Sequence, residues 1–280
     1  MKRVFVSGVF DNPRSPEIRF LHEASKLGPL TLVLWPDETV ATIRGAAPKM
    51  SLAERRYYFE ALRYVDKVEV APAGFDPDCL PIWQDSEQAV WALSAAVDGV
   101  GGGINAAKAS WCRLRGVELR EISGSKLSGF PYEPPPIAAP RSPGAKRVVV
   151  TGCFDWLHTG HLRFFEEASE YGELNVVIGS DANVRQLKGE GHPLFTQAER
   201  SYVVGSFRAV ARCLVSSGMG WLDAEPEIQA LGAERYLVNE DGDKSEKRRY
   251  CEEKGLEYIV LKRTPKEGLP KRSSTDLRGY

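Results

Sequence analysis

The stretch "VVVTGCFDWLHTGHLRFF", residues 148–165, joins a valine run to an amphipathic segment through a short loop. Continuous apolar runs of this kind are typical of strands that are buried on both faces of a parallel sheet. From Leu162 onward, apolar residues recur at the spacing of one helical face. The stretch therefore predicts a strand that ends at Gly152, then a loop, and then a helix that begins at Thr159 and Gly160.

The chain carries this stretch twice. The segment "SGVFDNPRSPEIRFLHEASKLG", residues 7–28, aligns without a gap with residues 151–172 and agrees with it at nine of 22 positions. The correspondence extends to two further pairs of segments, 30–45 with 174–189 and, after one inserted residue, 50–65 with 195–210. Each half has the pattern strand, helix, strand, which is the unit of a parallel sheet. We therefore expect an α/β protein with two tandem doubly wound, Rossmann-like parallel-sheet domains.

A proline-rich segment separates the two halves. Residues 129–146, "GFPYEPPPIAAPRSPGAK", hold six prolines in 18 positions. Proline fixes φ and has no N–H for a sheet, so this segment predicts a semi-rigid linker that belongs to neither core. The expected division is a first domain at 1–130, a linker at 131–145 and a second domain at 146–280.

Composition narrows the class of protein. The 280 residues are 42% hydrophobic and 27% charged, as in globular proteins, and the net charge of −1 does not favour a nucleic-acid partner. The first residues do not form a signal peptide, and no apolar run approaches the ~18 residues of a spanning helix. The five cysteines are odd in number and form no Cys-x-x-Cys pair, which argues against a disulfide framework and a zinc site. We therefore expect a cytoplasmic protein without membrane insertion.

Two histidines mark the most reactive part of the stretch. His158 and His161 are three residues apart at the start of a helix, where free N–H groups and a positive partial charge favour anions. Gly160 between them allows a phosphate to approach the backbone. Asp155 is near enough in sequence to position a histidine or a metal-bound group. In open α/β sheets, ligands bind at this carboxyl end of the strands.

The two histidines have three other interpretations. A zinc site would need a third Cys or His partner, and none accompanies them, so no metal ligand is predicted. Ordinary polar residues at a helix start remain an alternative, although the whole chain has only four histidines. A dinucleotide site would need Gly-x-Gly-x-x-Gly, which is absent.

The segment "TGCFDWLHTGH" resembles the His-x-Gly-His signature of the cytidylyltransferase-like nucleotidyltransferases. This family includes the glycerol-phosphate, phosphocholine and phosphoethanolamine cytidylyltransferases and the adenylyltransferase that makes ADP-heptose. The resemblance spans essentially all of residues 147–280. "GSDANVRQLKG" is similar to the second strand and lysine loop, "FTQAER" to the segment with a triphosphate-binding arginine, and "LKRT" with "KRSSTDLR" to the closing motif.

The resemblance implies roles for individual residues. His158, His161 and Lys188 would be catalytic. The nucleotide would contact a larger set, namely Gly152, Cys153, Phe154, Asp155, Gly160, Arg200, Arg263, Arg272, Ser273, Ser274 and Thr275. An insertion leaves open which of Arg263 and Arg272 contacts the triphosphate. Asp181, Asn239 and Asp241 are weaker matches to substrate-binding positions, and "VNEDGD" (238–243) reads equally well as a solvated acidic turn. Mg²⁺ would arrive with the nucleotide, because it prefers phosphate oxygens and water.

The implied activity is transfer of CMP from CTP to a small phosphorylated alcohol or amine, such as phosphoethanolamine or glycerol phosphate, with release of pyrophosphate. Two alternatives stand beside it: ATP-dependent adenylyl transfer to a sugar phosphate, and a non-catalytic nucleotide sensor or scaffold.

The first copy lacks the chemistry of the second. Arg14, Ser15, Pro16 and Glu17 stand where the second copy has His-Thr-Gly-His. Glu17 would place a negative charge where a triphosphate should bind. We therefore expect one active site per chain, in the second half. The first half would act as a built-in partner in an intramolecular pseudo-dimer, and a homodimer of chains is a further expectation from the resemblance.

Overall fold

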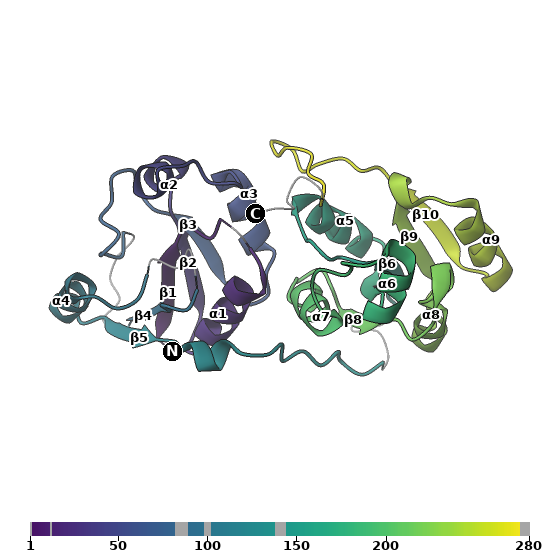
Figure 1. Ribbon diagram of the computed structural model, residues 1–280, viewed down its shortest axis with the longest axis horizontal. Helices are drawn as coiled ribbons and strands as arrows, with labels where there is room; N and C mark the ends of the chain where they lie inside the picture. The colour runs from purple at the N-terminus through teal and green to yellow at the C-terminus, as the bar shows by residue number, and fades with distance from the viewer. Residues whose placement is uncertain (1, 12, 82–88, 98–101, 138–143, 275–280) are drawn as a thin grey trace. The chain divides into compact units, whose positions relative to one another are not determined.

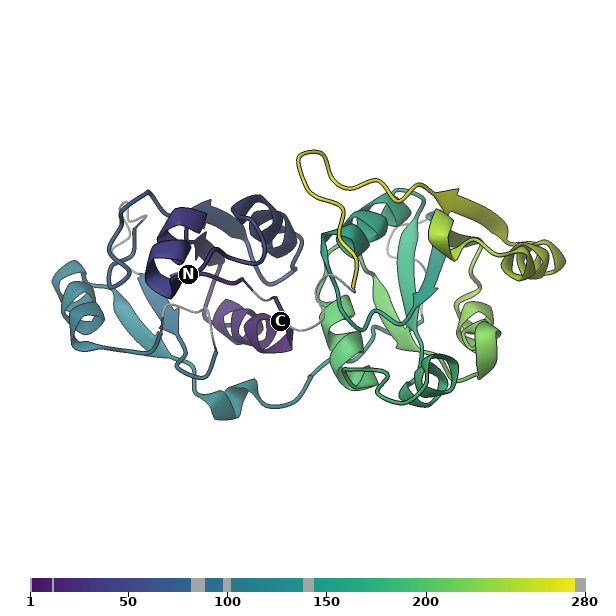
Figure 2. The ribbon, with the colours of Figure 1, turned by 45° about the horizontal axis from the view of Figure 1, so that its top comes forward.

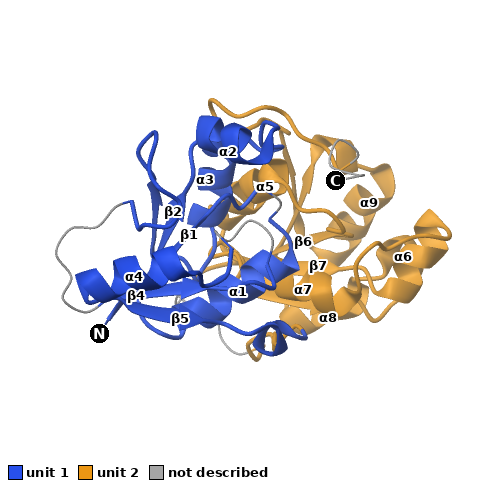
Figure 3. Ribbon diagram, turned by 60° about the vertical axis from the view of Figure 1, so that its left-hand side comes forward, with its two compact units in different colours: residues 1–129 blue, residues 130–280 orange. Residues whose placement is uncertain are grey.

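The computed structural model describes residues 2–11, 13–81, 89–97, 102–137 and 144–274. The chain divides into two compact units, Met1–Gly129 and Phe130–Tyr280, which Figure 3 shows in different colours. Each unit is described by itself below. In the described part of the chain, no helix is both long and apolar enough to cross a membrane.

The first unit is a five-stranded parallel sheet with the order β3-β2-β1-β4-β5. Its described elements are, in chain order, β1 (Arg3–Gly8), α1 (Ser15–Ser25), β2 (Leu30–Leu34), α2 (Asp37–Arg44), α3 (Leu52–Glu60), β3 (Lys67–Val70), β4 (Ala89–Leu93), α4 (Ala106–Arg115), β5 (Glu118–Glu121) and the 3-10 turn η1 (Gly124–Leu127).

The second unit repeats this plan. Its sheet has the order β10-β9-β6-β7-β8, again all parallel. Its described elements are β6 (Arg147–Gly152), α5 (Thr159–Ser169), β7 (Glu173–Ile178), α6 (Asp181–Lys188), α7 (Gln197–Gly205), β8 (Arg212–Val215), η2 (Gly220–Leu222), α8 (Glu225–Leu231), β9 (Arg235–Asn239), η3 (Glu240–Gly242), α9 (Ser245–Lys254) and β10 (Glu257–Leu261). Read from its β8 edge, this sheet has the strand order of the first unit. The prediction of two tandem doubly wound α/β domains is confirmed (Figure 1).

The valine run forms the centre of the second sheet. Val148, Val149 and Val150 are fully buried in β6, as a strand covered on both faces requires. The crossover from β6 to β7 through α5 runs in the opposite direction along the sheet from the crossover from β9 to β10 through α9. Since both crossovers are right-handed, α5 and α9 cover opposite faces (Figure 2). The carboxyl end of β6 therefore lies between two helical layers.

The proline-rich segment is not outside both cores. The Tyr132 ring packs so closely on Gly205 of α7 that a Cβ there would lie 2.2 Å from Tyr132 Cε2. The Tyr132 hydroxyl accepts a hydrogen bond from the Cys213 amide at 2.8 Å, and the Pro136 carbonyl accepts one from Arg212 Nε at 3.2 Å. Tyr132 and Pro136, within the range 131–145 that the sequence predicts as a linker, thus pack on the second unit, and residues 138–143 of that range lie outside the described residues. β8 lies at an edge of the sheet, where unpaired N–H groups need acceptors, and the start of this segment supplies them.

Candidate active site

The turn from β6 to α5 is built by His158 itself. β6 ends at Gly152, α5 begins at Thr159, and His158 is the N-cap residue. His158 Nδ1 accepts a hydrogen bond from the Gly160 amide at 3.1 Å, which satisfies one of the free N–H groups at the helix start. The predicted strand, loop and helix are confirmed. Phe154 in the loop has a φ of 50°, in the left-handed region, and turns the chain back over the end of the strand.

The two histidine rings lie against each other. Their centroids are 4.0 Å apart, and the Phe154 ring meets His161 edge-on at 5.4 Å. His161 Nδ1 is buried, without a hydrogen-bond partner in the described part of the chain. Burial, and then the positive charges of His158, Arg263 and Lys188, hold the pKa of His161 well below its usual value. The imidazole is therefore neutral at pH 7, in surroundings that attract an anion.

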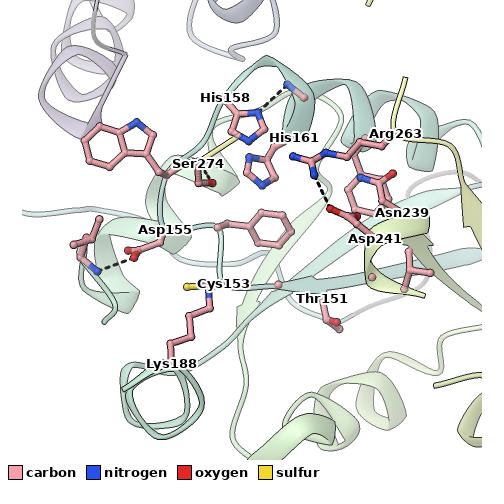
Figure 4. A pocket seen from close by; sticks show the side chains of 18 of the residues that line it. Thr151, Cys153, Asp155, His158, His161, Lys188, Asn239, Asp241, Arg263 and Ser274 are labelled. Carbon is pink, nitrogen blue, oxygen red and sulfur yellow. Dashed lines mark hydrogen bonds and ion pairs between the residues drawn. The ribbon is translucent and has the colours of Figure 1, made fainter. Parts of the chain in front are cut away.

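These rings open into a cavity of about 230 Å³ at the carboxyl end of β6 (Figure 4). Among the residues that line it are twelve of the residues singled out from the sequence: Gly152, Cys153, Phe154, Asp155, His158, Gly160, His161, Lys188, Asn239, Asp241, Arg263 and Ser274. Residues far apart in the chain thus meet at one edge of the sheet, as expected for an open parallel sheet.

Lys188 and Arg263, both predicted from the sequence, reach this cavity from different parts of the chain. Lys188, the last residue of α6, points toward Cys153, where it lies within hydrogen-bond reach of the thiol (Figure 4). Burial raises the pKa of the Cys153 thiol, so this cysteine stays protonated at neutral pH. Arg263 Nη1 pairs with Asp241 at 2.7 Å, and its Nη2 donates to the Arg272 carbonyl at 3.2 Å.

The structure therefore distinguishes the two candidate arginines. Arg263 lines both the cavity beside the histidines and a neighbouring hollow between α5 and the C-terminal segment, whereas Arg272 lines the hollow but not the cavity. Ser274, which also lines the cavity, donates from its hydroxyl to the Trp156 carbonyl at 3.2 Å. Ser273 is described but does not line the cavity, and Thr275 lies outside the described residues.

Asp155 holds the next loop in place. Its two carboxylate oxygens accept hydrogen bonds from the amides of Leu194 and Phe195, at 2.8 and 2.9 Å. His192 Nδ1 lies 3.7 Å from the same carboxylate. Asp155 lines the cavity, but both its carboxylate oxygens already accept hydrogen bonds from backbone amides. It therefore mainly holds the loop at Leu194 and Phe195 against the cavity.

Arg200 and Asp181, which the resemblance assigns to the nucleotide and the substrate, do not line this cavity. The Arg200 side chain is 1% exposed. Its guanidinium donates to three carbonyls, those of Phe195, Cys153 and Gly179, and to Asp181 Oδ1 at 2.8 Å. All three guanidinium nitrogens are thereby used inside the protein, and Asp181 is held as their counter-charge. Sequence could not show this, because an arginine that ties loops together and one that binds phosphate look alike.

Comparison with known proteins decides the family of this unit. The family model described as Cytidylyltransferase-like matches residues 149–278. Residues 149–278 form a cytidylyltransferase-like domain. The predicted resemblance is confirmed.

Parts of the chain are also similar to individual proteins. The chain is 41% identical over 75 residues to the bifunctional protein HldE of Geobacter metallireducens, which covers 26% of this chain and 15% of that protein. It is 34% identical over 125 residues to HldE of Alkalilimnicola ehrlichii, and this alignment covers 44% of this chain and 26% of that protein. The chain thus spans a small part of the length of these relatives. A solved lipopolysaccharide core biosynthesis protein from Thermoplasma volcanium is 22% identical, with a TM-score of 0.38, and covers 44% of this chain and 100% of its own.

The cytidylyltransferase-like domain also uses residues that the sequence analysis did not single out. These further lining residues are Thr151, Trp156, Phe164, Leu194, Val238, Gly242 and Lys247. Thr151 could have been found, since it precedes the glycine at which the strand ends. Lys247 could not, because it lies in a run of charged residues, which usually marks a solvated helix face.

In the first unit, the Glu17 side chain occupies the equivalent helix start, that of α1. Glu17 in the first turn of α1 is buried, and its carboxylate accepts a hydrogen bond from the Arg14 amide at 3.2 Å. A negative charge therefore stands at the helix start, where the cytidylyltransferase-like domain has His161. The backbone frame is retained, since Phe10 has a φ of 51° and Phe154 one of 50°.

Proposed function

We propose that the cytidylyltransferase-like domain transfers AMP from ATP to the phosphate of a sugar phosphate and releases pyrophosphate. The observation that carries the nucleotidyl transfer is the pair of adjacent histidine rings at the start of α5, in one cavity with Lys188 and Arg263. The choice of ATP and a sugar phosphate rests on the HldE relatives and on the resemblance to the ADP-heptose adenylyltransferase.

In this reaction an oxygen of the acceptor phosphate attacks the α-phosphorus of ATP, and the bond between that phosphorus and the bridging oxygen to the β-phosphorus breaks. Pyrophosphate carries away the electron pair. Such transfers depend on positioning and on charge that stabilises the phosphoryl oxygens. At this cavity Lys188 and Arg263 supply positive charge, and the rings of His158 and His161 supply hydrogen-bonding groups.

Mg²⁺ enters this proposal as part of the nucleotide. In the described chain, no group of three or more His, Cys, Asp or Glu side chains is placed to hold a metal ion. The two carboxylates that line the cavity are engaged, Asp155 with backbone amides and Asp241 with Arg263. A magnesium ion on the phosphates would therefore complete its shell with phosphate oxygens and water.

CTP with a small phosphorylated alcohol or amine is the second candidate. It is supported by the similarity of "FTQAER", residues 195–200, to phosphoethanolamine cytidylyltransferases and by the description of the family. None of residues 195–200 lines the cavity, and the Arg200 guanidinium is buried against Asp181. The residues that line the cavity therefore support nucleotidyl transfer more directly than they support CTP as the nucleotide.

The test is pyrophosphate release by the full chain with ATP or CTP, Mg²⁺ and a panel of sugar phosphates, glycerol 3-phosphate and phosphoethanolamine. The proposal expects turnover with ATP and a sugar phosphate. Turnover with CTP alone would replace it by the second candidate. Nucleotide binding without pyrophosphate release from any pair would identify a sensor and overturn nucleotidyl transfer.

A further inference from the structure

Lys247 is a cavity cation to which no role has been assigned so far. It lies in the first turn of α9, directly after the acidic loop, and its side chain lines the cavity. Its ammonium stands 5.8 Å from the centre of the Tyr236 ring and close to Gly242, where a Cβ would lie 4.0 Å from Nζ. Within the described part of the chain, the Lys247 ammonium makes no hydrogen bond or ion pair, whereas the Lys247 amide donates to the Lys244 carbonyl at 3.1 Å. A cation at such a place is available for a ligand.

Its surroundings distinguish Lys247 from an ordinary surface lysine. Burial, and then the charge of Lys244, hold its pKa below the usual value for a lysine. The Tyr236 ring under the ammonium is itself buried, and its hydroxyl is 2.6 Å from the Thr151 hydroxyl, which also faces the cavity. Lys247, Thr151 and Tyr236 thus form a small polar group at the end of β6 and β9.

This group lies on the other face of the sheet from the histidines. Tyr236 packs in a core cluster with Ile228 of α8 and with Tyr250 and Cys251 of α9. The helix start that carries His161 belongs to the opposite face. Lys247 therefore approaches the end of β6 from the layer of α8 and α9, and the histidines approach it from the layer of α5.

The geometry of phosphoryl transfer assigns different ligands to these two layers. The attacking and leaving oxygens of such a reaction lie roughly in line across the phosphorus. If the α5 layer holds the leaving pyrophosphate, the attacking phosphate must come from the opposite side, where Lys247 and Thr151 lie. On this basis, we propose that Lys247 binds the phosphate of the acceptor, with the Thr151 hydroxyl beside it, and so positions the attacking oxygen.

The chemistry of the side chains fits this ligand. A lysine ammonium is a compact point charge with three donors, suited to phosphate oxygens. Binding a dianionic phosphate next to it would offset the cost of burying its charge. The inference rests on the proposed function, because it takes the α5 layer as the site of the pyrophosphate.

The test compares Lys247→Met with Lys254→Met in the full chain. Lys254 ends the same helix, pairs with Glu225 at 3.0 Å and stands 5.9 Å from the Tyr250 ring, but it does not line the cavity. With the best sugar phosphate of the panel, K247M should raise the KM for the acceptor at least tenfold and the KM for the nucleotide less than threefold. K247R should recover part of the loss. K254M should leave both constants as in the wild type.

Equal acceptor KM values for K247M and K254M would overturn the inference while leaving the proposed function intact. So would a rise confined to the nucleotide KM. If the wild type releases no pyrophosphate, the proposed function fails by itself. The role of Lys247 is then tested by calorimetry. Inorganic phosphate is titrated into the wild type, K247M and K254M, each saturated with α,β-methylene-ATP. Weaker binding in K247M than in K254M supports the phosphate site, and equal or absent binding in all three proteins overturns it.

Discussion

Arg55 and Arg200 make the same set of hydrogen bonds in the two units. Each guanidinium donates to three main-chain carbonyls and to one aspartate, Asp37 for Arg55 and Asp181 for Arg200. The carbonyls come from the turn after the first strand, from the end of the second strand and from the loop before the helix. The first unit keeps this network although it lacks the histidines, which indicates that the arginine holds the fold together.

We therefore expect Arg200→Met and Arg55→Met to destabilise their own units by similar amounts, about 3 kcal/mol each, because three carbonyls and an aspartate lose their donor. Urea unfolding should measure the loss, and hydrogen–deuterium exchange resolved by peptide should assign it to one unit. At a temperature where R200M is folded, its KM for the nucleotide should match that of the wild type. A tenfold higher KM without a loss of stability would instead place Arg200 on the triphosphate.

His161→Asn should lower kcat by about 10²–10³, the usual effect of losing one donor to a developing phosphoryl charge. His161 carries no structural hydrogen bond from Nδ1 in the described chain, so the fold should survive the change. His22→Asn in the first unit is the matched control and should leave kcat unchanged. Wild-type turnover by H161N with the best acceptor would remove the histidine pair from the chemistry.

The stability of the first unit should fall in acid because of His22. Burial, followed by the charges of Lys26 and Arg19, lowers the pKa of His22 to about 4, whereas the unfolded chain has an ordinary histidine pKa near 6.5. Between these values the unfolded state binds the proton and the folded state does not, so the free energy of unfolding decreases as the pH falls from about 6.5 to about 4.

His22→Phe removes the titrating group and keeps an aromatic ring against Tyr64, which now stacks on His22 at 4.2 Å. Urea unfolding of this unit at pH 7 and pH 5 should show a smaller difference for H22F than for the wild type. The same difference in both proteins would mean that other groups cause the acid sensitivity.

The sequence was a good guide to everything that depends on local pattern. The valine run, the helical spacing after it and the gap-free repeat predict the strand, the helix and the second copy of the fold. They also place the histidines at a helix start, because His158 is itself the cap. The helix start and its cap need only neighbouring residues to form.

Features that depend on distant partners were beyond the sequence. Whether an arginine turns inward to carbonyls or outward to a ligand depends on segments 21 and 47 positions away along the chain, as Arg200 shows. Lys247 reaches the cavity only because α9 packs on the Tyr236 face. Tyr132 packs on the second unit because its hydroxyl accepts a hydrogen bond from the Cys213 amide of the edge strand β8. In each case a tertiary contact outweighs the local pattern.

That last contact can be tested by a double-mutant cycle. Gly205→Ala should destabilise the second unit by about 1–3 kcal/mol, because its Cβ would collide with the Tyr132 ring and force the ring away. In a Tyr132→Ala background the same change should cost much less, since no ring is left to displace. Urea unfolding of the four proteins gives the coupling energy. Additive losses would show that residues 130–137 are not fixed on α7 and β8.

Glu17 provides the test of one active site per chain. Its carboxylate accepts a hydrogen bond from the Arg14 amide at the start of α1. The equivalent helix start in the other unit carries the histidines. Glu17→Ala should reduce the stability of the first unit by about 1 kcal/mol through the lost cap, because a free amide remains at the helix start. The rate of pyrophosphate release should stay at the wild-type value, measured on the same preparation as the urea unfolding. If E17A changes kcat or the nucleotide KM by more than about threefold while the fold is intact, the first unit takes part in the chemistry, and the carboxylate at its helix start is regulating a second nucleotide site.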